Sequence, residues 1–244
     1  MNAEKAPGNH ITAQRVSRFR RKLLAWFPGN GRSFQWRCEG ASSYLLVVVE
    51  VLLQRTRAET IRAFLPSFLA RFPSWAHIAT SDVNDLSEAL KPIGLWRRRA
   101  PPLRALACEM AARGEQWPPH RGELERMPAV GQYVANAVLL FIHGEAHPLM
   151  DASMARLLRR YFAIAPVMAD IRYDKGLHAV AYRVLSGGDA PKMNWAILDV
   201  AATYCKPRQP ACPSCPLKRS CAHARSGVVS PSVQGKLSLK GRST

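Results

Sequence analysis

The sequence predicts an all-α protein, and three observations support this fold class. Segments whose apolar residues recur at helical spacing follow one another through most of the 244 residues. Clusters of Gly, Pro and Asn separate these segments, whereas segments with the alternation of a β-strand are hard to find. Hydrophobic residues make up 48% of the chain, which is enough for one large domain or two small subdomains with a proper core.

The predicted helices begin and end near residues that cap or break helices. Ser81 or Asp82 suits the N-cap of one helix, and Pro92 and Gly94 follow its end. The predicted helices span residues 15–27, 42–54, 58–72, 81–90, 101–113, 130–142, 153–162, 175–186 and 194–204. The tail 222–244 is rich in Ser, Gly and Lys, and we expect it to be disordered.

The net charge of the chain indicates what kind of partner it binds. The 35 Lys and Arg residues outnumber the 17 Asp and Glu residues, so the formal net charge is +18. Counterion release favours binding of such a chain to DNA or RNA, although a merely soluble basic protein is the alternative. A run of about 18 apolar residues is missing, so no membrane span is expected. The first residues carry no apolar signal-peptide core, and we expect a cytoplasmic protein associated with the nucleoid.

Four of the six cysteines crowd into one segment. Cys205, Cys212, Cys215 and Cys221 have the spacing C-x6-C-x2-C-x5-C. A zinc site is one interpretation, but structural zinc sites usually show two close cysteine pairs and this segment has one. The longer arms favour a cubane iron–sulfur cluster, whose irons are spread in space.

A tight turn precedes one of the predicted helices. Pro128, Val130 and Gly131 belong to this turn, and apolar residues recur at helical spacing after it. A helix–hairpin–helix of this kind aims backbone N–H groups at a phosphate without reading the base sequence. An ordinary pair of antiparallel helices is the alternative.

Two carboxylates are candidates for chemistry. Asp151 follows Gly131 by twenty residues and suits a helix N-cap, but it also suits the mouth of a cleft, and the two roles are compatible. Glu50 lies within the apolar segment 45–53, where a charge is costly unless it is paired or functional.

Together these motifs resemble the helix–hairpin–helix DNA glycosylases of the endonuclease III type. The cysteine spacing, the L-x-x-M-P-x-V-G hairpin and the later Asp151 carry the resemblance. The segments 34–37 and 43–56 look like the "PWR … SEVMLQQT" region of A/G-specific adenine glycosylases and of thymine glycosylases acting on G·T mismatches. The Pro-Trp of that motif is altered here to Gln35-Trp36.

The resemblance implies two helical subdomains that flank a DNA-binding cleft. Residues 42–146 would form a six-helix barrel with the hairpin, and residues 147–221 the subdomain that bears a [4Fe-4S] cluster on its four cysteines. Residues 1–41 would pack with the cluster subdomain.

The resemblance also implies a mechanism. The enzyme would flip a base out of double-stranded DNA. Ionised Asp151 would stabilise the positive charge that develops on the sugar, and Glu50 would protonate the departing base. Tyr133 stands where strand-cleaving relatives carry Lys, adenine glycosylases usually Ser and thymine glycosylases Tyr. No lysine lies between Lys91 and Lys175, which argues against an amine nucleophile and for a monofunctional enzyme.

Substrate and DNA contacts follow as expectations. Tyr133 and the short tail after Cys221 favour thymine or uracil opposite guanine, whereas adenine opposite guanine or 8-oxoguanine is the alternative. A non-catalytic DNA-binding or redox-sensing iron–sulfur protein is the rival from another class. We expect a monomer that binds DNA with a mismatched or damaged base. The residues expected to wedge into the duplex or touch the partner base are Gln54, Arg55, Leu95 and Trp96, and those expected at phosphates are Arg97, Arg98 and Arg99.

Overall fold

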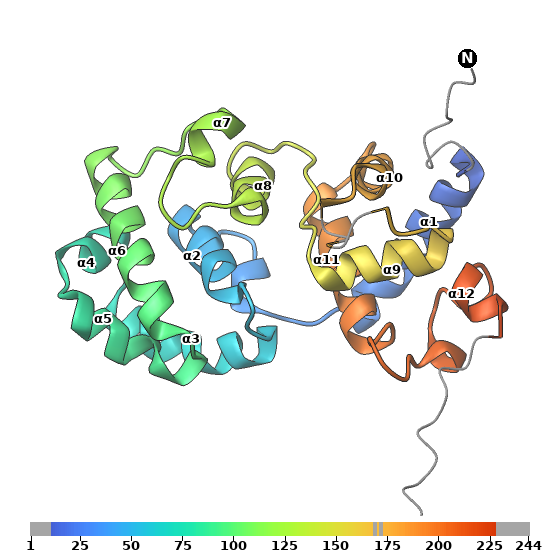
Figure 1. Cartoon of the computed structure of the whole chain (residues 1–244), viewed down its shortest axis with the longest axis horizontal. Helices are drawn as coiled ribbons and strands as arrows, with labels where there is room; N and C mark the ends of the chain where they lie inside the picture. Colours follow the sequence, from blue (N-terminus) through green and yellow to red (C-terminus); the bar gives the residue numbers. More distant parts are fainter. Residues whose placement is uncertain (1–10, 168–169, 171–172, 228–244) are drawn as a thin grey trace, which may run out of the picture.

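The computed structural model of the chain describes residues 11–167, 170 and 173–227, and all regular elements within them are helices (Figure 1). This confirms the predicted all-α class. None of the described helices is both long and apolar enough to cross a membrane.

The helices form two groups that lie side by side (Figure 1). The first group comprises η1 (Gln35–Arg37), α2 (Ser43–Leu53), α3 (Ala58–Arg71), α4 (Trp75–Thr80), α5 (Val83–Leu90), η2 (Lys91–Ile93), α6 (Trp96–Ala112), α7 (Arg121–Leu124) and α8 (Gln132–Phe141). The second comprises α1 (Ala13–Asn30), α9 (Ala152–Phe162), α10 (Lys175–Leu185), α11 (Ala190–Thr203), η4 (Cys212–Ser214) and α12 (Ala222–Arg225).

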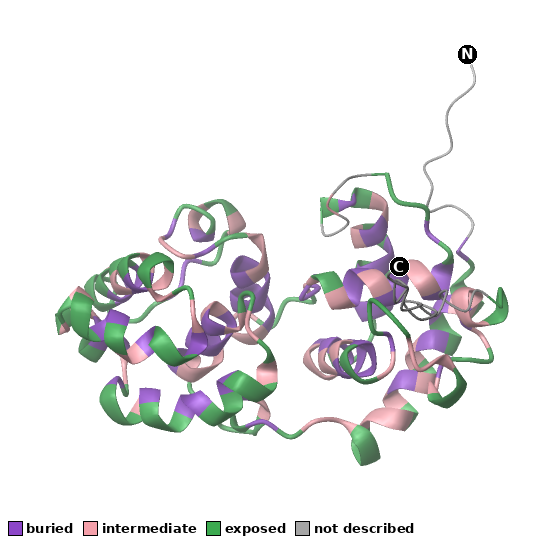
Figure 2. Cartoon of the chain, turned by 60° about the horizontal axis from the view of Figure 1, so that its bottom comes forward, coloured by how far each residue is buried: buried purple, intermediate pink, exposed green. Residues whose placement is uncertain are grey.

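Buried residues lie inside each of the two groups (Figure 2). They form two hydrophobic cores, and α8 contributes to both. Val134 and Val138 of α8 pack in the first core, whereas Ala137 and Leu140 pack in the second. A helix that is apolar around most of its surface must be covered on most sides, and α8 is buried at every position from Val134 to Leu140. Phe34 packs in the first core, whereas Phe19 and Leu23 pack in the second, so residues 11–41 contribute to both cores. The predicted subdomain boundaries stay predictions.

Most helix ends lie within two or three residues of the predicted positions because capping side chains set them. Ser42 accepts a hydrogen bond from the backbone N–H of Leu45, and Asp82, not Ser81, caps α5. The short helices α4, α7 and α12 were not predicted, since none is long enough to show helical periodicity. The prediction of a disordered tail from residue 222 was wrong for Ala222–Arg225, and residues 228–244 lie outside the described residues.

Two predicted helix starts were wrong. Helix α6 begins at Trp96 rather than at residue 101, because packing against α4 and α5 extends it by more than a turn ahead of Pro101 and Pro102. Helix α11 begins at Ala190 rather than at residue 194. Its N-cap is Asp189, which accepts a hydrogen bond from the backbone N–H of Lys192, and a proline follows in the first turn as helix starts favour.

Two segments connect the groups, and α11 holds both of them. Residues 31–42 lead from α1 to α2, and residues 142–151 lead from α8 to α9 (Figure 1). Asp199 of α11 accepts a hydrogen bond from the backbone N–H of Arg32 at 2.8 Å, which fixes the first connection. Asn194 of α11 accepts one from the N–H of Leu149 at 2.8 Å and donates to the carbonyl of His147 at 3.1 Å, which fixes the second. Both α11 side chains are fully buried.

Candidate functional site

Buried Glu50 of α2 and half-buried Tyr133 of α8 form a hydrogen-bonded pair. The Tyr133 hydroxyl donates a hydrogen bond to Oε2 of Glu50 at 2.8 Å. Only 3% of Glu50 is exposed, and burial raises the pKa of its carboxyl group to about 7, against the hydrogen bond from Tyr133 and the charge of Arg37, which lower it. A carboxyl group in this state carries a proton near neutral pH and can give it to a neighbouring base or nucleotide.

Asp151 is the N-cap of α9 and lies near this pair. Its Oδ1 accepts hydrogen bonds from the backbone N–H groups of Ser153 at 2.9 Å and Met154 at 2.6 Å. Burial raises the pKa of Asp151 overall, although these two hydrogen bonds and the charge of Arg156 oppose the rise. The charge of Asp151 in turn raises the pKa of both Glu50 and Tyr133, so the three side chains share one electrostatic environment.

The two carboxyl groups therefore differ in how strongly their surroundings stabilise the ionised form. Burial raises the pKa of both carboxyl groups, but at Asp151 the N–H groups at the positive end of α9 oppose this rise by stabilising the ionised form. Neighbouring carboxyl groups whose surroundings separate their pKa values can act as one acid and one anion.

The predicted hairpin is present, with α7, a tight turn and then α8. Ala129 in the turn has the left-handed φ of 59°, and Gly131 is the N-cap of α8. Gly131 is exposed, and a Cβ atom added there would meet no atom within 4 Å. Val130 is buried in the first core and its N–H bonds to the carbonyl of Met127, so Gly131 is the better placed of the two to meet a ligand.

Three of the four predicted wedge residues lie on two neighbouring loops, and the fourth, Trp96, is the first residue of α6. Gln54 and Arg55 are exposed just after α2, and Arg55 has a left-handed φ of 60°. Leu95 precedes α6 with a left-handed φ of 55°, and 45% of it is exposed. Trp96 beside it is half-buried.

Arg99 joins these two loops instead of facing solvent as a phosphate contact. Its guanidinium donates to the carbonyls of Leu52 at 2.7 Å and Gln54 at 2.6 Å, and to the hydroxyl of Thr56 at 2.7 Å. The expectation that Arg99 binds phosphate is therefore wrong in this structure, because its donors are used to hold the chain after α2. Arg97 and Arg98 are exposed.

The four cysteines of the spacing motif line one small cavity beside α9. Cys205 and Cys221 are buried, and Cys212 and Cys215 are half-buried. Arg160 of α9 donates to Sγ of Cys205 at 3.5 Å, and Arg156 donates to the carbonyl of Cys205 at 2.6 Å. Among the described residues, no group of three or more His, Cys, Asp or Glu side chains is arranged to hold a metal ion.

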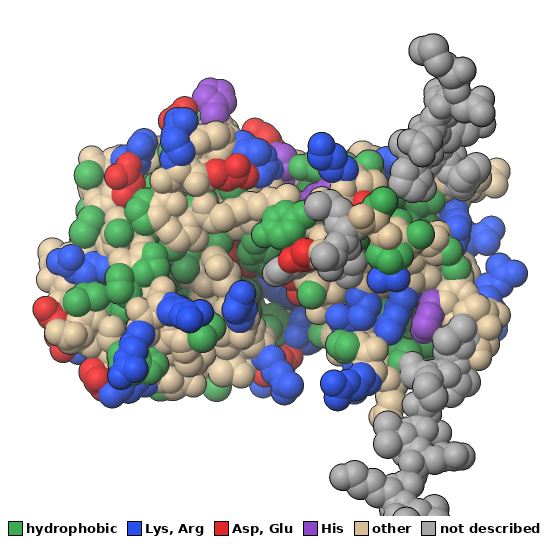
Figure 3. Space-filling view, viewed as in Figure 1, with side chains coloured by type: hydrophobic (Ala, Val, Ile, Leu, Met, Phe, Trp, Pro, Cys, Tyr) green, Lys and Arg blue, Asp and Glu red, His purple; other side chains and the backbone are tan. Residues whose placement is uncertain are grey.

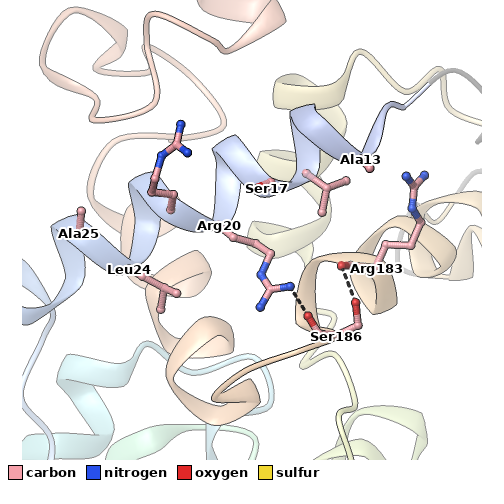
Figure 4. Close-up of a pocket in the computed structure, with 9 residues that line it drawn as sticks. Ala13, Ser17, Arg20, Leu24, Ala25, Arg183 and Ser186 are labelled. Carbon is pink, nitrogen blue, oxygen red and sulfur yellow. Dashed lines mark hydrogen bonds between the residues drawn. The ribbon is translucent and has the colours of Figure 1, made fainter.

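A wider hollow between α1 and α10 has a different character (Figure 4). Val16 and Leu24 line it, and so do Arg20 and Arg183. Arg20 donates to the carbonyl of Ser186, and Arg183 donates to that of Ile11 at 2.7 Å, so both arginines serve the chain itself. Its lining contains no Asp, Glu, His or Cys, and we assign it no chemistry.

Comparison with known proteins identifies the family. Residues 48–176 match the HhH-GPD superfamily base excision DNA repair proteins. The chain belongs to this superfamily, which confirms the predicted resemblance.

Relatives and solved structures agree with this placement. The chain is 30% identical to "Thymine-DNA glycosylase" of Aeropyrum pernix, and the match covers 86% of this chain and 95% of the relative. It is 26% identical to "Adenine DNA glycosylase" of Homo sapiens, and that match covers 93% of this chain and 43% of the relative. A thermostable thymine-DNA glycosylase structure superposes with a TM-score of 0.76 at 25% identity, covering 88% of this chain and 99% of that one. An endonuclease III–DNA covalent intermediate superposes with a TM-score of 0.72 at 18% identity, covering 88% and 98%, and shows the shared fold.

Sequence analysis missed Arg37 and Asp199. Arg37 of η1 donates to Oδ2 of Asp199 at 2.8 Å and to Oδ1 at 3.1 Å. Asp199 is a charged residue in the apolar stretch 196–202, the signal that singled out Glu50, and the same reasoning applied there would have found it.

Proposed function

We propose that this chain is a monofunctional DNA glycosylase that flips a mismatched or damaged base out of duplex DNA and hydrolyses its N-glycosidic bond. The observation that carries the proposal is the hydrogen bond from Tyr133 to buried Glu50 near Asp151, in a member of a base excision repair superfamily. The preferred substrate is thymine or uracil opposite guanine. The site of action is the chromosome, at the nucleoid.

The chain's own residues divide the chemistry. Protonated Glu50 gives its proton to the departing base, which leaves with the electron pair of the glycosidic bond. The carboxylate of Asp151, oriented by the two N–H groups at the start of α9, stabilises the positive charge on the sugar and directs the attacking water. Tyr133 holds the Glu50 carboxyl in place through its hydroxyl.

Tyr133 and the relatives support the choice of base. The relatives named thymine-DNA glycosylase and "Thymine/uracil-DNA glycosylase" of Pyrobaculum aerophilum match over 95% and 89% of their own length. The human relative named adenine DNA glycosylase matches over 43% of its length. Adenine opposite guanine or 8-oxoguanine is the alternative substrate, because the same superfamily contains both names.

Several features of the structure suit DNA binding. Lys and Arg side chains lie on both helix groups around the hollow between them (Figure 3), where they would meet phosphates of one duplex bound by one protein copy. Open space at Gly131 lets a phosphate approach the backbone at the start of α8. Gln54, Arg55, Leu95 and Trp96 would fill the gap left by the flipped base, and Pro128 and Val130 shape the turn before Gly131.

A release assay tests this function. Duplexes carrying G·T, G·U, A·8-oxoguanine or an alkylated base are incubated with the protein, and free base is measured by chromatography. We expect thymine and uracil opposite guanine to be released, and the DNA to break only after alkali. Tight DNA binding without release of any base would establish the non-catalytic rival.

A second experiment tests the proposal that the enzyme does not cleave the DNA strand. Replacing Tyr133 by Lys puts an amine beside Asp151, and we expect some strand breakage without alkali together with a borohydride-trapped protein–DNA adduct. A clean abasic product from Tyr133→Lys would mean that this side chain does not face the sugar.

We also propose that Cys205, Cys212, Cys215 and Cys221 hold a [4Fe-4S] cluster. Their arrangement around one cavity supports this, since four cysteine thiolates are the usual ligand set of such a cluster. When bound, the cluster would cross-link the end of α11, through Cys205, to the segment that carries Cys212, Cys215 and Cys221. Iron and acid-labile sulfide in anaerobically purified protein test the proposal, with Cys212→Ser expected to lose both. A colourless protein that binds zinc would show a zinc site instead.

A further inference from the structure

Arg37 is buried at the junction of the two helix groups. Only 9% of its side chain is exposed, and the centre of its guanidinium lies 4.9 Å from the ring centre of Phe34 and 5.4 Å from that of Trp195. Phe34 stacks on Trp36 at 4.4 Å with an interplanar angle of 9°. These aromatic contacts fix the guanidinium in one place.

Arg37 shares its buried carboxylate partner with a second arginine. Asp199 is fully buried and accepts hydrogen bonds from both Arg37 and Arg32. Arg32 also reaches Glu59 at 2.8 Å, but the side chain of Glu59 is 54% exposed. A single buried carboxylate therefore serves two guanidinium groups. The Nε of Arg37 is buried and has no hydrogen-bond partner in the described chain.

The positive charge of Arg37 is close enough to Glu50 to affect its carboxyl group. Helix η1, which ends at Arg37, packs against α2, which carries Glu50. The charge of Arg37 favours the ionised form of Glu50 and so lowers the pKa of its carboxyl, while no such effect of Arg32 is found. The other groups that act on Glu50 are Tyr133 from α8 and Asp151 from the start of α9. Helix α3 also packs against α2, and its Glu59 is paired with Arg32.

We propose that Arg37 is a positioning residue of the glycosylase reaction: anchored by Asp199, its charge offsets the negative charge that Glu50 acquires when it protonates the departing base. Without this cation, proton donation would leave a buried carboxylate beside the carboxylate of Asp151, which is costly. The protons balance because the water that adds to the sugar gives up one proton, which Asp151 accepts. This inference rests on the proposed function of Glu50.

Two matched variants separate this role from a structural one. Arg37→Gln and Arg32→Gln each remove one cation from the same carboxylate of Asp199. In the parent protein we expect single-turnover base release to fall as pH rises through about 7, as Glu50 loses its proton. Arg37→Gln raises the midpoint of this fall by about half a pH unit or more and lowers the maximal rate, because an opposite charge near a carboxyl lowers its pKa. Arg32→Gln leaves the midpoint in place, and Arg37→Lys, which keeps the charge, restores it.

Equal midpoints in Arg37→Gln, Arg32→Gln and the parent protein would overturn the proposal. If Arg37→Gln folds poorly, Arg37→Met takes its place, since an apolar chain of similar length fills the slot between the two rings. Carbon-13 NMR of the Glu50 carboxyl, assigned with Glu50→Gln, measures the same shift without any substrate. A parent protein that releases no base would refute the proposed function, while the NMR titration would still decide whether Arg37 controls Glu50.

Discussion

A buried carboxyl group lowers stability unless its charge is paired or removed. Glu50 meets this condition in two ways, through the hydrogen bond from Tyr133 and through a pKa raised to about 7. The hydrogen bond fixes the position of the carboxyl group, and the raised pKa keeps it protonated near neutral pH. Both properties suit a proton donor, and both have a consequence for stability that can be measured without substrate.

The free energy of unfolding of Glu50→Gln, compared with that of the parent protein at the same pH, should increase as the pH rises. The unfolded carboxyl has a pKa of 4.5 and the folded one about 7, so between these values the folded protein holds a proton that the unfolded chain has lost. Parent stability then falls as pH rises from about 4.5 to about 7, by up to roughly 3 kcal/mol. Gln has no proton to lose and can still accept the hydrogen bond from Tyr133.

Urea unfolding of both proteins at about pH 5 and about pH 8 measures this difference. We expect Glu50→Gln to gain about 1–3 kcal/mol over the parent between the two conditions. Parallel pH dependence in the two proteins would mean that Glu50 titrates normally in the folded state.

At the scale of one element, α9 links the candidate site to the cysteine cavity. Asp151 is its N-cap, and Arg156 and Arg160 further along it hold the chain around Cys205. The sequence predicted both roles of Asp151, since an acidic residue before a run with helical spacing is a typical N-cap. It did not predict that the arginines of the same helix bind the cysteine segment, because contacts between residues 45 or more positions apart leave no local pattern.

Substitutions at Asp151 should separate capping from chemistry. Asp151→Ala removes the acceptor for two backbone N–H groups and should lower the free energy of unfolding by about 1 kcal/mol. Asp151→Asn keeps an oxygen at the same position and should change it by less than about 0.5 kcal/mol, because Asn caps helices as well as Asp. Thermal or urea unfolding gives both values. A large loss in Asp151→Asn would show that the charge itself stabilises α9.

At the scale of the whole molecule, α11 holds the two connections between the helix groups. The order and class of the helices followed from periodicity and caps, which are local properties of the sequence. The pairing of Arg37 with Asp199 spans 162 positions, and only the folded chain brings them together. For the same reason the fully buried Asn194 and its contacts to residues 147 and 149 were not foreseen.

Removal of the Asn194 side chain should weaken the molecule as a whole. Asn194→Ala leaves the buried N–H of Leu149 and the half-buried carbonyl of His147 without this partner, which should lower the free energy of unfolding by about 2–3 kcal/mol. Asn30→Ala is the matched control, since exposed Asn30 makes a single hydrogen bond to the carbonyl of Trp26 and should cost less than about 0.5 kcal/mol. Equal urea midpoints for the two variants would mean that the second connection does not depend on α11.

The most direct test of the central claim is release of thymine and uracil from G·T and G·U duplexes under single-turnover conditions, with the parent protein and Asp151→Asn side by side. We predict that the parent frees the base and leaves an alkali-labile strand, and that Asp151→Asn binds the same duplex but releases less than about one thousandth as fast, a barrier increase of about 4 kcal/mol. Base release by Asp151→Asn at the parental rate would contradict the claim that this carboxylate faces the sugar of the flipped nucleotide.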